Sequence, residues 1–206
     1  RPRMSRAGYL LRKERGDDPA AEYLQGAALV VDAETGAMRA LIGGRSFEES
    51  NFNRAVMAMR QPGSAFKPFI YLAGIQRGFY PSYTIVDAPI VFHERGQPPW
   101  RPQNYDREYH GPVTLRYALQ KSLNIPTIKI QEEVGTEKVI EVARAAGIET
   151  PIPQFRSIAL GTAEVTLRDL TYAYAVFANE GIRVDPIFIN RIEDHAGNLL
   201  KEWKPK

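Results

Sequence analysis

The sequence contains no cysteine among its 206 residues. Disulfide bonds, thiolate metal sites and cysteine nucleophiles are therefore excluded. No stretch approaches the roughly 18 consecutive apolar residues that a membrane-spanning helix needs. The first residues contain neither an initiator methionine nor the apolar core of a signal peptide. We therefore expect a fragment or a processed product without a membrane span or a leader of its own.

Histidine is scarce, and no two histidines stand four residues apart. The three are His93, His110 and His195. Without cysteine, such isolated histidines do not favour a zinc site. A glycine-rich phosphate loop is also missing, as is a GxGxxG pattern. We therefore expect neither a metal nor a cofactor.

Positive charge is concentrated at the N-terminus. The net charge is +3, but residues 1–16 contain six basic side chains against one acidic one, which leaves −2 for the remainder. We interpret residues 1–24 as a basic linker and residues 25–206 as a folded domain. A nucleic-acid-binding arm is the alternative, but a single basic run without interleaved aromatic residues favours a solvated linker. We expect no nucleic-acid partner.

The chain as a whole has ordinary globular composition, with 44% hydrophobic and 25% charged residues. Two apolar runs, 27–31 and 38–42, flank the turn-forming residues 32–36 and predict a β-hairpin. Both runs are so apolar that we expect the strands to be covered on both faces. A second hairpin is predicted at residues 186–192 and 199–203.

Helices are predicted between the two hairpins. One spans 64–77, a short one starts at Thr114, one starts at Gly135, and one starts at Thr166 with a capping-box pattern. Residues 80–111 are predicted to be a long ordered loop of the kind that is often functional. This order predicts an α/β or α+β fold, with an antiparallel sheet flanked by helices.

Ser64 and Lys67 form the first candidate catalytic pair. They are three residues apart at the start of a predicted helix and so share a face. A serine nucleophile needs a base, and a neutral lysine amine one turn away can serve. The helix N-terminus contributes too little to neutralise the lysine, so burial and a second cation must supply most of the pKa shift. The alternative interpretation is an N-cap serine and a solvated lysine.

Ser122 and Asn124 form the second candidate pair. They lie between two predicted helices, just before Pro126. A hydroxyl there can relay a proton between Lys67 and a leaving group, and an amide can donate to a substrate carbonyl while it accepts from the lysine. The alternative interpretation is a turn that serine and asparagine stabilise.

Together these residues resemble the transpeptidase domain of bifunctional class A penicillin-binding proteins. The similar stretches are residues 60–69 (RQPGSAFKPF), 109–116 (YHGPVTLR), 121–126 (KSLNIP), 159–166 (ALGTAEVT) and 177–181 (FANEG). The resemblance extends from about Gly26 to Trp203, nearly the whole chain, and identifies residues 25–206 as a partial domain of that family. It implies a β-lactamase/transpeptidase-like fold that is incomplete at the C-terminus.

The resemblance also implies a role for each candidate residue. Ser64 would be the acylated nucleophile, Lys67 its general base, and Ser122 a proton shuttle. Asn124 would position the donor, a peptidoglycan stem peptide ending in D-Ala-D-Ala. An amine from a second stem would then resolve the acyl-enzyme, and β-lactam antibiotics would acylate the same serine. Such a protein would act in the bacterial cell envelope, on the outer face of the cytoplasmic membrane. A membrane anchor upstream of these residues would hold it there.

Two alternatives remain open for this fold, because function depends on the site and not on the fold. One is a non-catalytic module that senses β-lactams or peptidoglycan and stays acylated. The other is a D-Ala-D-Ala carboxypeptidase, which differs only in using water as the acceptor.

The third motif of the family, Lys-Thr-Gly or a close variant, does not occur in these residues. Its loss would remove a second cation near Lys67, contacts to the substrate carboxylate and one oxyanion-hole amide. Losing one oxyanion donor alone lowers the rate by about 10²–10³. We therefore predict that the 206-residue polypeptide acylates slowly or not at all. Gel fluorescence after incubation with a fluorescent penicillin measures this, and rapid stoichiometric labelling of Ser64 would contradict it.

Overall fold

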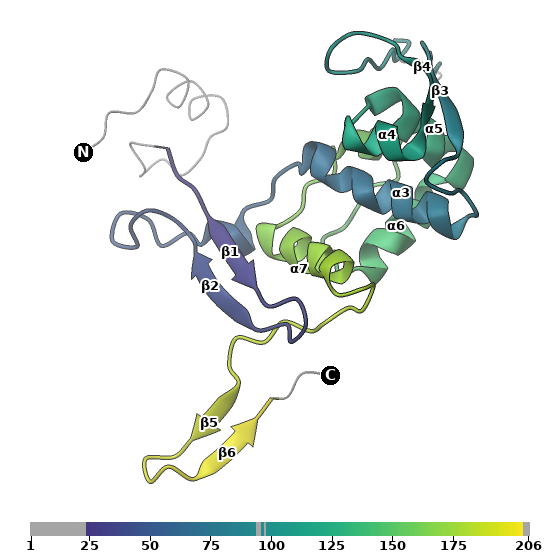
Figure 1. The fold of residues 1–206 in the computed structure, drawn as a ribbon. Helices are drawn as coiled ribbons and strands as arrows, with labels where there is room; N and C mark the ends of the chain where they lie inside the picture. The colour runs from purple at the N-terminus through teal and green to yellow at the C-terminus, as the bar shows by residue number, and fades with distance from the viewer. Residues whose placement is uncertain (1–23, 94–95, 97, 204–206) are drawn as a thin grey trace. The chain divides into compact units, whose positions relative to one another are not determined.

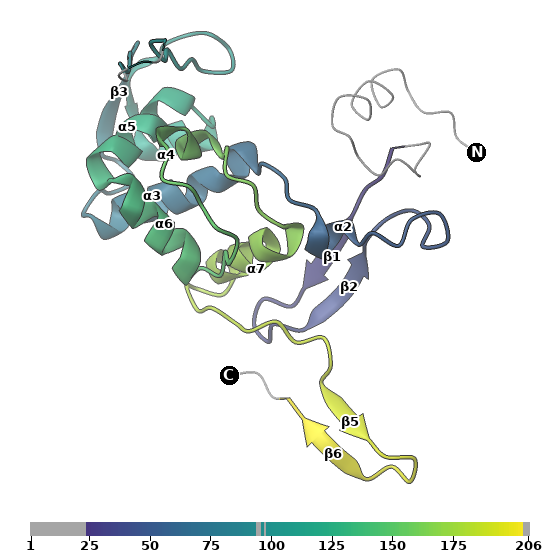
Figure 2. The same cartoon turned by 180° about the vertical axis from the view of Figure 1, so that it is seen from behind.

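The structure, a computed structural model, describes residues 24–93, 96 and 98–203 (Figures 1 and 2). The predicted linker, residues 1–24, lies outside this part except for Leu24. The described residues form two compact units. The first takes its residues from Arg1–Arg60, Ala146–Ile148 and Val165–Lys206, and the second from Gln61–Ala145 and Glu149–Glu164.

The first unit begins with the predicted hairpin. Strand β1 (Ala28–Val31) pairs antiparallel with β2 (Met38–Ile42). Asp32 holds the turn, because its carboxylate accepts the amide N–H of Thr35 at 3.0 Å. Gly36 follows with a φ of +75°, a conformation that favours glycine.

The hairpin is not covered on both faces, contrary to what its apolar sequence led us to expect. Val30 and Ile42 are 54% and 57% exposed. Burial alternates along β1, and α7 (Leu167–Ala178) packs against that strand. In the described part of the chain this sheet has only two strands. An apolar run therefore marked a strand correctly but not the number of layers around it.

Helix α7 begins as the capping pattern predicts. The Thr166 hydroxyl oxygen accepts the amide N–H of Asp169 at 3.0 Å. The helix contacts both β1 and the short α2 (Arg54–Met57) (Figure 2). The residues that it buries are Asp169, Tyr172, Ala173, Ala175 and Val176. Four larger apolar side chains of α7 are partly or largely exposed: Leu167, Leu170, Tyr174 and Phe177.

The predicted second hairpin forms, but it is shorter than expected. Strand β5 (Arg191–Glu193) pairs antiparallel with β6 (Leu199–Glu202). Of the residues before β5, Ile187 makes a single parallel bridge to Ala37. Asp194 organises the turn by accepting the amides of Ala196 and Asn198 at 2.9 and 2.8 Å.

The second unit is built around α3 (Lys67–Gln76). This helix packs against α4 (Leu115–Gln120), α5 (Asn124–Val134) and α6 (Thr136–Ala145), and Figures 1 and 2 show the four helices together. The fully buried apolar side chains of this second unit include Phe66, Phe69, Ile70, Ile125, Ile128, Ile130, Val139 and Ile158. Burying each such side chain contributes about 1.5–3 kcal/mol. This core makes α3 a rigid support for whatever lies at its N-terminus.

The segment predicted as an uninterrupted loop, residues 80–111, contains a strand. Strand β3 (Thr84–Asp87) pairs antiparallel with β4 (Gly111–Thr114), so that Asp87 lies opposite Gly111. A run of four residues is too short for periodicity to reveal, and Pro112 in β4 argues against a strand. The pairing brings both ends of the remaining loop together.

Two short 3₁₀ helices meet closely beside α3. They are η1 (Gly63–Phe66) and η2 (Arg156–Leu160). The Gly63 amide donates to the carbonyl of Gly161 at 3.2 Å. Gly161 has a φ of +67°, and a Cβ on it would overlap the backbone of Gly63. A side chain at 161 would thus push against the turn that contains Ser64.

We therefore predict that Gly161→Ala destabilises the protein more than a matched glycine substitution. Gly111 has the same φ of +67°, but a Cβ there meets nothing within 4 Å. Gly111→Ala should cost about 1–2 kcal/mol from backbone strain alone. Gly161→Ala should cost at least twice as much in the free energy of unfolding measured with urea. Equal losses for the two variants would contradict the close contact.

Candidate active site

Lys67 is a charged residue that is only 1% exposed. It lies where η1 passes into α3, and its backbone N–H bonds to the carbonyl of Ser64. Phe66 and Phe69 on either side are fully buried, which draws this turn into the core. Pro68 occupies the first turn of α3, where the missing amide has no helical partner to lose. The local sequence therefore buries the stem and head of Lys67 together.

The Lys67 Nζ donates to three oxygens of one neighbouring turn. These are the carbonyl oxygen of Ser122 at 2.5 Å, its Oγ at 3.1 Å and the Oδ1 of Asn124 at 2.7 Å. An ammonium has three N–H donors, and each has an acceptor here. The structure thus brings together three of the four residues that the sequence nominated.

Ser122 has a left-handed backbone, with a φ of +55°. Its N–H donates to the carbonyl of Leu119, and that of Leu123 donates to the carbonyl of Ala118. This is the Schellman arrangement that ends many helices, usually with glycine at the left-handed position. Serine there costs about 1–2 kcal/mol of backbone strain. In this left-handed conformation, both the carbonyl oxygen and the Oγ of Ser122 face Lys67.

Asn124 is the first residue of α5. Its side chain faces two ways, because Oδ1 accepts from Lys67 while Nδ2 donates to the carbonyl of Gln103 at 2.8 Å. Pro126 lies in the first turn of α5, so it does not interrupt the helix. The amide orientation is therefore fixed by a donor on one side and an acceptor on the other.

Burial lowers the pKa of Lys67 from 10.5 to about 8. The three acceptors favour the ammonium, but the loss of water outweighs them. At pH 7, about a tenth of the molecules then have a neutral amine. In that state the Ser122 hydroxyl can donate to the Nζ lone pair, so the pair can pass a proton in either direction. Burial produces this shift without the second cation that the sequence argument required.

Ser64 is exposed, one turn before Lys67. Neither η1 nor α3 has a side-chain cap, so Ser64 is not the N-cap of either helix. Lys67 is likewise not the solvated lysine of the alternative interpretation. An exposed hydroxyl one turn before a buried amine of lowered pKa is suited to nucleophilic attack on a bound substrate.

Sequence reasoning missed the residues that hold Asn124. Asn104 and Asp87 are 3% and 0% exposed, and both belong to the segment that was predicted to be a loop. His110 contacts Asp87 through its backbone and its ring. No local pattern marks these residues, because their partners lie 17 to 23 positions away.

Residues 24–93, 96 and 98–203 contain no group of three or more metal-ligating side chains that could hold an ion. The helices in this same part of the chain are too short or too polar to cross a membrane.

Comparison with known proteins places these residues in context. Residues 26–206 match the family model described as the penicillin binding protein transpeptidase domain. Penicillin-binding protein 1A of Pseudomonas aeruginosa is 41% identical over 209 residues, which cover 98% of this chain and 25% of that protein. Penicillin-binding protein 1A of Aquifex aeolicus is 44% identical over 185 residues, which cover 89% and 25%. The chain thus spans about a quarter of the length of these relatives.

Solved structures agree with this match. Penicillin-binding protein 1A from Haemophilus influenzae superposes with a TM-score of 0.84 at 36% identity, covering 88% of this chain and 27% of that one. The PonA1 protein from Mycobacterium tuberculosis, in complex with penicillin V, gives 0.77 at 26% identity, with coverage of 94% and 53%. The chain therefore shares its fold with penicillin-binding proteins, and it mixes helices with antiparallel strands as predicted.

The pKa of Lys67 predicts a distinctive pH dependence of stability. Because this pKa is lower in the folded state, the unfolded state binds more protons between about pH 8 and 10.5, and stability rises with pH in that window. Lys67→Met removes the titration but keeps an apolar stem. The unfolding free energy of the wild type, minus that of Lys67→Met, should increase by up to about 3 kcal/mol between pH 7 and 10.5. Urea titrations measure it, and a constant difference would show that Lys67 titrates normally.

Proposed function

Because this chain belongs to the penicillin-binding protein transpeptidase family, we propose that it contributes the nucleophile and base of a peptidoglycan D,D-transpeptidase. Ser64 is the nucleophile, Lys67 the general base, Ser122 the proton shuttle, and Asn124 the residue that positions the donor. The donor is a stem peptide that ends in D-Ala-D-Ala. This function belongs on the outer face of the cytoplasmic membrane, where peptidoglycan is assembled.

Acylation begins when the neutral amine of Lys67 takes the proton of Ser64. The Ser64 Oγ attacks the carbonyl carbon of the penultimate D-Ala, and an O–C bond forms. The C–N bond to the terminal D-Ala then breaks. The proton passes from Lys67 through the Ser122 hydroxyl to the leaving nitrogen, so that D-Ala departs as a neutral amine. The donor remains attached to Ser64 as an ester.

Deacylation runs the same path in reverse. An amine of a second stem peptide attacks the ester carbonyl, its proton returns along Ser122 and Lys67, and Ser64 regains its hydroxyl. A new amide bond then joins the two stems. A β-lactam follows only the first half, because its opened ring stays attached to the acyl group.

The contact of Lys67 with Ser122 and Asn124 is the observation that supports this proposal most directly. The lysine is 55 and 57 positions from its partners, so their meeting is a property of the folded unit and not of a local turn. The amine is buried and partly neutral at pH 7, as a base requires. The penicillin V complex of PonA1 supports a β-lactam as a ligand.

We predict that the full-length gene product is labelled by a fluorescent penicillin at Ser64. Ser64→Ala should abolish labelling, and Ser157→Ala should leave it unchanged as the matched control. Ser122→Gly should lower the acylation rate by about 10²–10⁴, because it removes the proton shuttle. The same variant should change the free energy of unfolding by less than about 1 kcal/mol, because glycine relieves the left-handed strain while the buried Lys67 loses one hydrogen-bond acceptor. Mass spectrometry of peptides locates the label, and urea unfolding measures the stability.

Three results would count against the proposal. Labelling that persists in Ser64→Ala would place the nucleophile elsewhere. Acylation followed only by hydrolysis, when a D-Ala-D-Ala peptide and an acceptor amine are supplied, would indicate a carboxypeptidase. Acylation by penicillin without turnover of any peptide donor would indicate a sensor.

A further inference from the structure

Helix α5 lacks an N-cap side chain of its own. The N-cap residue, Leu123, offers no polar atom, although the first amides of a helix need acceptors. Asn104 supplies one from outside the helix. Its Oδ1 accepts the N–H of Asn124 at 2.8 Å and that of Ile125 at 3.2 Å. A residue 20 positions upstream therefore acts as the cap.

Asn104 and its neighbour Gln103 hold both ends of Asn124. Asn104 binds the Asn124 backbone N–H, and the carbonyl of Gln103 binds its side-chain Nδ2. With these two groups occupied, the remaining Oδ1 of Asn124 faces the Lys67 Nζ at 2.7 Å. The geometry of the lysine contact thus depends on two successive residues that do not touch the lysine.

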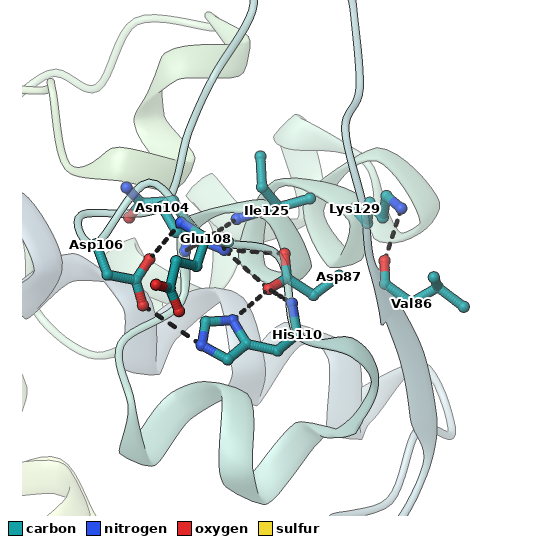
Figure 3. A network of polar contacts seen from close by, with 9 residues as sticks. Val86, Asp87, Asn104, Asp106, Glu108, His110, Ile125 and Lys129 are labelled. Atoms are coloured by element: carbon teal, nitrogen blue, oxygen red, sulfur yellow. Dashed lines mark hydrogen bonds and ion pairs between the residues drawn. The ribbon is translucent and has the colours of Figure 1, made fainter.

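The buried carboxylate of Asp87 orients Asn104 (Figure 3). Asn104 Nδ2 donates to Asp87 Oδ1 and Oδ2 at 3.0 and 2.8 Å, and to the carbonyl of Glu108 at 2.9 Å. Only one orientation of the Asn104 amide places its nitrogen toward these acceptors and its oxygen toward the α5 amides. Since an unpaired buried carboxylate is costly, this arrangement is strongly determined.

His110 completes the surroundings of Asp87. Its backbone N–H and its Nδ1 lie 3.0 and 2.8 Å from Asp87 Oδ2. On the outer side, its Nε2 lies 3.4 Å from a carboxylate oxygen of Asp106. The hydrogen bond to Asp87 raises the pKa of His110, and Asp106 and Glu108 act in the same direction. The Asp87 carboxylate is therefore matched by donors on both Asn104 and His110.

We propose that Asn104, oriented by Asp87, is a positioning residue of the active site. It determines where α5 begins, and thereby where Asn124 and the turn at Ser122 meet Lys67. It touches neither the nucleophile nor the base. Its importance for catalysis rests on the proposed function, whereas its effect on α5 and on Lys67 does not.

Asn104→Ala is the principal test, with Gln131→Ala as its matched control. Gln131 is about as buried as Asn104 and lies on α5, but its Nε2 donates to the Thr136 hydroxyl and the Arg156 carbonyl, away from the N-terminus of that helix. Asn104→Ala should lower the rate of Ser64 acylation by fluorescent penicillin roughly 10- to 100-fold in the full-length gene product, since small displacements of catalytic groups have effects of this size. Gln131→Ala should keep the rate within about twofold, although it also loses hydrogen bonds.

Two readouts do not require activity. Hydrogen exchange should show that Asn104→Ala exposes the amides of Asn124 and Ile125, while that of Ile128 remains protected. The NMR titration of the Lys67 side chain should shift its midpoint in Asn104→Ala and keep it in Gln131→Ala. If Ser64 is not acylated even in the wild type, the proposed function fails, and these two readouts still decide the positioning role.

Swapping the side chains of Asp87 and Asn104 gives a second test that remains informative if Asn104→Ala does not fold. Asn104→Asp alone places two carboxylates together, and Asp87→Asn alone places amide donors together, so each should lower the acylation rate. The double variant Asp87→Asn/Asn104→Asp restores a donor and acceptors between the two positions, and should be faster than either single variant. Unchanged exchange at Asn124 and Ile125, an unshifted Lys67 titration, near-wild-type acylation in Asn104→Ala, or no rescue in the double variant would overturn the proposal.

Discussion

The buried ammonium of Lys67 is the interaction on which the arrangement of this site depends. An amine that has lost its water needs other partners, and all three of its hydrogen bonds end on one turn between α4 and α5. Those bonds fasten Ser122 and Asn124 to the start of α3, next to Ser64. The burial that requires these contacts also lowers the pKa of Lys67. Geometry and basicity therefore have a single physical origin.

The contacts around Lys67 form a series of hydrogen bonds, in which each residue fixes the orientation of the next one toward the lysine. Asn124 is held by Gln103 and Asn104, and Asn104 in turn by the Asp87 carboxylate at the end of β3. The left-handed backbone of Ser122 is the point where strain is retained. A glycine would suit that backbone better but would offer no hydroxyl. Backbone strain is therefore retained at Ser122, where the hydroxyl contacts Lys67.

Local chemistry was predictable from the sequence, whereas long-range pairing was not. Thr114 and Thr166 cap their helices as expected, because a cap involves residues three positions apart. The Ser-x-x-Lys and Ser-x-Asn patterns nominated Lys67, Ser122 and Asn124, and the structure places the last two within hydrogen-bonding distance of the lysine. Asp87 and Asn104 gave no such signal, since each is meaningful only beside the other. The exposure of the first hairpin was missed for the same reason, because strand composition does not report what lies beside a sheet.

The distance along the chain between Lys67 and its partners has a consequence for the newly made polypeptide. Until α3 and α5 have packed together, Lys67 is an ordinary solvated side chain that stays protonated at neutral pH. In the proposed mechanism Ser64 then has no base, and the polypeptide does not react with acyl donors. On the proposed mechanism, reactivity arises only in the finished tertiary structure, so an immature or misassembled molecule would not consume substrate in unproductive esters.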